Sequence, residues 1–162
     1  MKDDLLPSAP VDPRWAEIWQ QLGHGAPTLS ALAQVCSFSL VSGGDQSIVL
    51  SPEARTILYA AKDSALVEIK GSNRAFDAPG RMLAVYVETT PGQTLIFRNR
   101  ENPAATIRFL AGFRELCAAG YMMHHIYQEF SLTRAGLDLA QTIPLGEVQN
   151  YLKLATDSGQ YE

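Results

Sequence analysis

Residues 102–142 constrain the fold most strongly, because two helix signals flank a pair of short alternating segments there. We predict a helix, a hairpin of two strands and a second helix, over 103–118, 121–125, 128–132 and 134–142. Asn102 followed by proline is typical of a helix start, Gly120 of a helix end, and Thr133 of a helix cap. Adjacent helices and hairpin strands of this kind indicate an α+β fold.

Upstream, proline, glycine and serine divide the chain into shorter predicted elements. We predict helices over 14–22, from Pro27 onward, over 52–62 and over 78–88, strands over 36–40, 47–50, 66–70 and 94–98, and a last helical piece over 148–155. The β-branched Val85 and Val87 leave a strand open as the alternative within 78–88. The predicted organisation is a flexible tail over 1–13, a small helix-helix-hairpin unit over 14–50, a main domain over 51–143, and a C-terminal helix and tail over 144–162.

The main domain resembles the winged helix-turn-helix superfamily. The similarity is carried by the helix end at Leu116, by Gly120-Tyr121, Phe130 and Leu132-Thr133 in the hairpin, and by Ala135-Gly136 at the next helix. Helices over 52–62, 78–88 and 103–118, with the strand 66–70, extend it upstream. One departure is the fourteen or so residues between the second and third helices, which the family joins by a tight turn. The resemblance implies a winged-helix fold that binds either nucleic acid or protein partners.

Charge is unevenly distributed along the chain. The stretch from Lys70 to Arg114 holds seven basic and three acidic residues, a net charge of +4, whereas the remaining 117 residues hold six basic and fourteen acidic residues, a net charge of −8. Such asymmetry predicts an anionic partner for one face, although arginines that merely solvate the surface are the alternative.

The predicted nucleic-acid site lies around the helix 103–118. Its apolar face is formed by Thr106, Phe109, Leu110, Phe113, Leu116 and Cys117, and its opposite face by Ala104, Arg108, Ala111, Gly112 and Glu115. Arg108 is placed to contact a base edge, with Arg114 at the margin. Arg98, Arg100 and the Asn102 end of the helix are expected to bind phosphates. Small residues on that face would equally let another helix dock.

No motif predicts an enzyme, a cofactor or a metal centre. His124 and His125 are adjacent on a predicted strand and therefore point to opposite faces. Asp45 with Glu68 and Lys70 forms the pattern of a metal-dependent nuclease, which we retain only as an alternative. Cys36 and Cys117 lie in apolar surroundings and are expected to be buried, reduced thiols.

These observations lead to one functional hypothesis and one alternative. We expect a cytoplasmic, non-enzymatic winged-helix protein that binds nucleic acid, with duplex DNA favoured. Its expected role is regulatory, such as transcription regulation. The alternative is a non-catalytic adaptor that uses the same fold to bind a protein partner. Homo-oligomers are possible, and no membrane segment is expected because no apolar stretch approaches the ~20 residues that span a bilayer.

Overall fold

The computed structural model describes Arg14, Glu17, Gln20 and residues 25–72 and 75–157. The expected tail over 1–13 and the apolar positions of the first predicted helix, Trp15, Ile18, Trp19 and Leu22, lie outside these described residues. None of the described helices is long and apolar enough to cross a membrane.

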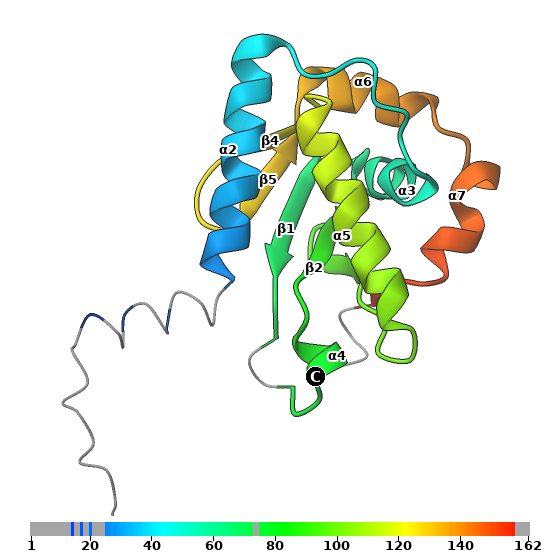
Figure 1. Cartoon of the computed structure of the whole chain (residues 1–162). Helices are drawn as coiled ribbons and strands as arrows, with labels where there is room; N and C mark the ends of the chain where they lie inside the picture. Colours follow the sequence, from blue (N-terminus) through cyan, green and yellow to red (C-terminus); the bar gives the residue numbers. More distant parts are fainter. Residues whose placement is uncertain (1–13, 15–16, 18–19, 21–24, 73–74, 158–162) are drawn as a thin grey trace, which may run out of the picture.

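The described part of the chain forms one antiparallel sheet with helices packed on one of its faces (Figure 1). The strands are β1 (Leu66–Lys70), β2 (Ala84–Thr90), β3 (Gln93–Ile96), β4 (Met122–His124), β5 (Glu129–Leu132) and β6 (Thr156–Asp157), in the sheet order β4-β5-β1-β2-β3-β6. The helices are α2 (Ala26–Ser42), α3 (Pro52–Ala61), α4 (Ala78–Arg81), α5 (Pro103–Ala118), α6 (Arg134–Thr142) and α7 (Leu145–Leu152). This architecture confirms the predicted α+β class.

Several predicted elements appear where their end signals place them. The Ser51 hydroxyl caps α3 by accepting from the amide of Ala54, and the Thr133 hydroxyl caps α6 by accepting from the amide of Gly136. Gly120 has a φ of 82°, the left-handed conformation that the exit from α5 requires. The strand β1 and the β4–β5 hairpin also occupy their predicted positions.

The predicted hairpin over 36–40 and 47–50 is wrong. Helix α2 continues to Ser42 and ends at Gly43, which has a φ of 88°, and residues 47–50 form no strand. Alternation of polar and apolar residues suggested a strand, but in the helix Leu32, Cys36 and Ser39 share the buried face. The Ser39 hydroxyl donates to the carbonyl of Ala118 at the end of α5, so a polar side chain is satisfied inside this contact.

The predicted helix over 78–88 is also wrong beyond its first turn. Asp77 caps the short α4, but the chain then enters β2, the strand that Val85 and Val87 had left open. Both valines are fully buried between the sheet and the helices, where β-branched side chains fit a strand well. In the last segment, α7 begins at Leu145 and ends at Leu152, earlier than the predicted 148–155.

The core lies between the sheet and the helix layer. Phe113 of α5 meets Phe130 of β5 edge to face, with ring centroids 5.0 Å apart at 87°, and Phe97 meets Phe109 at 4.4 Å. The predicted apolar face of the helix 103–118 does face the core, because Phe109, Phe113 and Leu116 are buried in one cluster with Phe130 and Leu132 of the hairpin. The opposite face of the sheet carries no helix from the described residues.

Candidate functional site

Arg98, one of the residues expected to bind phosphate, is only 8% exposed. Its guanidinium donates to the carbonyl oxygens of Met82 and Lys70, at 2.9 and 3.1 Å, and to the Tyr86 hydroxyl at 2.6 Å. These bonds join the end of β1 to the start of β2. The structure therefore places Arg98 as an internal cross-link, because its donors already face protein oxygens.

Arg100 and Asn102 lie at the surface near the start of α5. The Arg100 guanidinium is 3.9 Å from the Asp77 carboxylate, at the cap of α4. Asn102 ends a tight turn in which the Asn99 side chain accepts from the amides of Glu101 and Asn102. The hydrogen bond from Gly80 N–H and the nearby arginines hold the pKa of Asp77 below its ordinary value. Arg100 thus has an anionic neighbour of its own.

Arg108 and Arg114 are exposed on the outer face of α5, as expected. Gly112 and Glu115, predicted for that same face, instead contact α3: Gly112 is buried against Ala54, and the Glu115 carboxylate accepts from the amide of Ser51 at 2.8 Å. The accessible part of α5 is consequently narrower and less charged than predicted. It is the strip formed by Ala104, Ile107, Arg108, Ala111 and Arg114.

An apolar hollow of about 470 Å³ runs along this strip, between α5 and the first half of α2. We call it the α2–α5 groove, and it is lined by Thr28, Leu32, Met82, Leu83, Ile107, Leu110, Ala111 and Arg114. Arg114 is the charged residue among them, and Ile107 is 58% exposed. Sequence analysis missed this groove, although an isoleucine off the apolar face of a helix, one turn from Ala111, is a usable signal.

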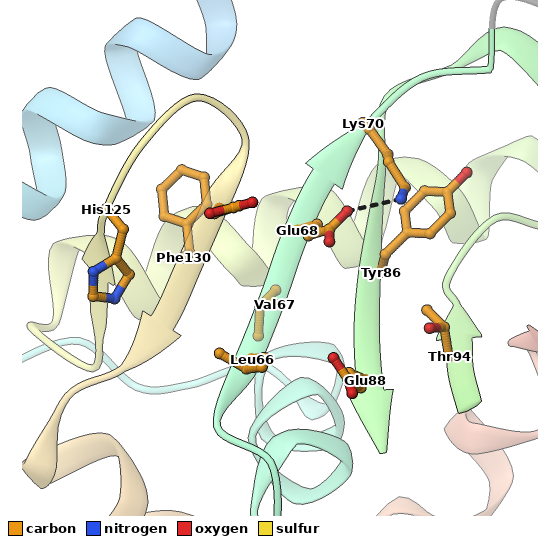
Figure 2. Close-up of a pocket in the computed structure, with 10 residues that line it drawn as sticks. Leu66, Val67, Glu68, Lys70, Tyr86, Glu88, Thr94, His125 and Phe130 are labelled. Carbon is orange, nitrogen blue, oxygen red and sulfur yellow. Dashed lines mark hydrogen bonds and ion pairs between the residues drawn. The ribbon is translucent and has the colours of Figure 1, made fainter. Parts of the chain in front are cut away.

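The open face of the sheet carries a second hollow of about 470 Å³, with a lining of both polar and apolar side chains (Figure 2). Glu68 stands at its centre, opposite Tyr86 on one side and Glu129 on the other in the strand register. Lys70 lies 2.7 Å from the Glu68 carboxylate and 4.5 Å from the centroid of the Tyr86 ring. Paired charges of this kind are what the solvated face of an antiparallel sheet ordinarily carries.

The residues of the nuclease pattern are not brought together. Glu68 and Lys70 lie on the open face of the sheet, whereas the amide of Asp45 bonds to the carbonyl of Ala118, at the end of a helix on the other face. The Ser47 hydroxyl and amide bond to the Asp45 carboxylate and hold its pKa below the ordinary value. Among the described residues, no group of three or more histidine, cysteine or acidic side chains is arranged to hold a metal ion.

The two histidines, the last residue of β4 and the one after it, point to opposite faces of the sheet, as predicted. His124 packs edge to face on Phe130 at 5.0 Å, whereas the His125 ring lies on the open face, with Nε2 2.8 Å from the Ser131 hydroxyl. Both cysteines are buried free thiols, and they neighbour each other where α2 meets α5. Burial raises the pKa of Cys117 far above its ordinary value, so this thiol stays protonated and helps join α2 to α5.

Comparison of the chain with protein-family models, curated protein sequences and solved structures finds no match.

Proposed function

We propose that this protein is a non-catalytic adaptor that binds a segment of a protein partner in the α2–α5 groove. The observation that carries the proposal is the exposed apolar lining of this groove, with Ile107 58% exposed and Leu110 half-buried beside it. Apolar side chains gathered in a hollow lose contact with water when a partner covers them, which favours association.

The groove's lining indicates the chemistry of the partner. Its floor and walls are aliphatic and methionine side chains, which suit leucine-sized or aromatic side chains. Arg114 lines one side, with Arg108 also exposed on α5, and none of the described carboxylates contributes to the lining. A short helical or extended segment with two or three apolar side chains and an aspartate or glutamate next to them complements this arrangement.

The walls of the groove are held in place before any partner arrives. Helix α2 is fixed to α5 by the contact between Cys36 and Cys117 and by the bond from Ser39 to Ala118. At the start of α2, Gly25 adopts a φ of 69°, and a Cβ there would lie 2.8 Å from the Leu83 side chain. A preformed groove loses little conformational entropy on binding.

Selection from a displayed random-peptide library tests the proposal. We expect selected peptides to combine apolar residues with a neighbouring acid, and to bind Ile107→Lys at least ~tenfold more weakly, a loss of about 1.4 kcal/mol. Leu145→Lys is the matched control, because Leu145 is 50% exposed at the start of α7, outside the groove lining. Arg114→Glu should weaken the acidic peptides selectively. Peptides that bind wild type and Ile107→Lys equally would reject the groove as the site.

Nucleic-acid binding is the second candidate, and the exposure of Arg108 and Arg114 favours it. The order of α3, β1, α5 and the β4–β5 hairpin follows the winged-helix resemblance, although β2 and β3 stand where that family has its second helix. Fluorescence anisotropy with duplex and single-stranded oligonucleotides across a salt series tests this candidate. Each phosphate contact adds about 0.9 to the salt slope on duplex DNA, so Arg108→Gln should lower the slope by about that amount. If the wild type binds neither oligonucleotide at low salt, nucleic-acid binding is rejected and the adaptor function is the remaining candidate.

A further inference from the structure

Helix α2 has an outer face that the described part of the fold leaves uncovered. The helix packs on α5 and β4 with its inner side and forms the edge of the helix layer (Figure 1). Its outer side includes Phe38, which is 75% exposed, and Val41, which is 90% exposed. The chain carries no charged residue from Ala26 to Gly44, so this face lacks the charges that normally solvate a surface helix.

The exposed side chains on this face follow one regular stripe. They are Pro27, Ala31, Gln34, Phe38 and Val41, separated by four, three, four and three residues. We call them the α2 stripe. Alternating spacings of three and four place residues along one side of a helix and are the spacing of a coiled-coil seam. The stripe exists only because residues 36–40 are helical, since a strand would send neighbouring side chains to opposite sides.

The order of sizes along the stripe is self-complementary. Gln34 is the central residue of α2, small residues precede it at Pro27 and Ala31, and large ones follow it at Phe38 and Val41. If a second α2 is placed antiparallel about a two-fold axis at Gln34, the large half of each helix meets the small half of the other. Large against small keeps the two helix axes at an even distance along a contact about 21 Å long. Parallel pairing would set Phe38 against its own copy.

We propose that the α2 stripe is a homodimer interface, occupied by α2 of a second copy of this chain in antiparallel orientation. Two observations favour a second copy over another partner: the size pattern complements itself, and the chain has a net charge of −4, so two copies approach at least cost through a charge-free face. The two Gln34 amides meet at the axis, where each can donate to and accept from the other. A single polar residue in such a seam fixes the register.

Neighbouring residues extend the contact area. The tip of the β4–β5 hairpin lies beside the first half of α2, since Tyr127 and Gln128 share a hollow with Ala26, Leu29 and Ala33. Tyr127 is 85% exposed. A stable interface buries about 800 Å² on each partner, more than one helix face supplies, and the exposed Tyr127 at the hairpin tip provides further apolar area on the flank of α2.

Molar mass by size-exclusion chromatography with light scattering, over a concentration series of the full chain, tests the proposal. We expect a dimer for the wild type and a dissociation constant at least ~tenfold higher for Phe38→Asp, equal to a loss of about 1.4 kcal/mol. Phe76→Asp is the matched control, because Phe76 is 99% exposed just before α4, outside the α2 stripe, and its variant should remain a dimer. Circular dichroism verifies that both variants fold. A wild type that stays monomeric throughout, or a dimer insensitive to Phe38→Asp, overturns the proposal.

The position of Gln34 permits a second, independent measurement. Gln34→Glu and Gln34→Lys should each weaken the dimer, because two like charges meet at the axis, and an equimolar mixture of the two should form a heterodimer. Gln149→Glu mixed with Gln149→Lys is the control, since Gln149 is exposed on α7, and both of these variants should dimerise like the wild type. Failure of the Gln34 mixture to restore the dimer would show that the two copies do not meet at this residue.

Discussion

Gly112 of α5 lies directly against the backbone of α3: a Cβ at Gly112 would come within 2.7 Å of the amide nitrogen of Ala54. The helical spacing predicted Gly112 on the accessible face of α5, where small residues let a phosphate or another helix approach. In the structure, this close approach is made by Ala54 of α3, in the same chain. One turn later, Glu115 accepts from the amide of Ser51, so this close crossing also holds the start of α3.

We therefore expect Gly112→Ala to lower the free energy of unfolding by about 1–3 kcal/mol, because the added methyl group meets backbone that cannot move aside alone. Alanine favours a helix over glycine by about 1 kcal/mol, and the clash must outweigh that gain. Gly146→Ala in α7 is the matched control, because nothing lies within 4 Å of its Cβ position and the variant should be neutral or more stable. Urea denaturation of both variants measures the difference. Equal free energies of unfolding for Gly112→Ala and Gly146→Ala would show that α3 and α5 do not meet closely at Gly112.

Phe113→Ala should be among the most damaging core substitutions. Phe113 is fully buried and packs edge to face on Phe130, so its removal leaves a cavity between α5 and β5. We expect a loss of about 3–5 kcal/mol in the free energy of unfolding. Phe76→Ala, at a side chain 99% exposed, should change the same quantity by less than about 0.5 kcal/mol. A loss below about 1 kcal/mol at Phe113 would mean that α5 faces another way.

Arg98→Gln separates an internal role of this arginine from a role in phosphate binding. The substitution removes the donors to Lys70 and Met82, and unsatisfied buried carbonyls cost on the order of 1–3 kcal/mol. Arg108→Gln, on the exposed side of α5, should leave stability within about 0.5 kcal/mol of the wild type. Thermal denaturation at matched salt compares the two variants. Normal stability of Arg98→Gln, combined with weakened binding to DNA, would restore Arg98 to the surface site.

The buried Cys117 thiol predicts a loss of stability at alkaline pH. Burial raises its pKa in the folded protein, whereas in the unfolded chain it ionises at the ordinary value for a thiol. Above that ordinary value the unfolded state binds fewer protons than the folded state, so the free energy of unfolding falls as the pH rises. Replacing both thiols, Cys36→Ala together with Cys117→Ala, should flatten this part of the pH profile relative to the wild type, measured by urea denaturation at a series of pH values. Both substitutions are needed because Cys36 is also buried, and burial would raise its pKa once its neighbour Cys117 is removed. Parallel profiles would indicate that Cys117 becomes solvated.

The sequence alone determined the elements whose ends are set by local chemistry. Ser51 before Pro52, Asn102 before Pro103 and Thr133 before a helix each satisfy or remove amides that a helix start leaves free, which requires no knowledge of the rest of the fold. The same holds for the exit from α5 at Gly120, where the backbone needs a positive φ. These signals involve residues within one turn of each other, so the chain carries them wherever it folds.

Tertiary structure decided between helix and strand in segments whose residue pattern is compatible with either. Residues 36–40 alternate like a strand, yet they are helical because Cys36 and Ser39 meet α5 through a thiol contact and a hydrogen bond to Ala118. Residues 84–88 followed a good helix start, yet they form β2 because Val85 and Val87 are buried between strands and helices. In both segments contacts distant along the chain outweighed local preference, which is small for each residue.

For the candidate site too, the sequence determined part of the picture and tertiary structure decided the rest. From the sequence, Arg98, Arg100, Arg108 and Arg114 formed one basic surface because they are close along the chain. The fold separates them, since Arg98 turns inward to the carbonyls between β1 and β2 while Arg108 and Arg114 stay on α5. The α2–α5 groove and the α2 stripe were invisible until α2 was known to be a helix beside α5. The sequence lists the side chains of the protein. Only the packing of helices and strands determines which side chains face one another and which face solvent.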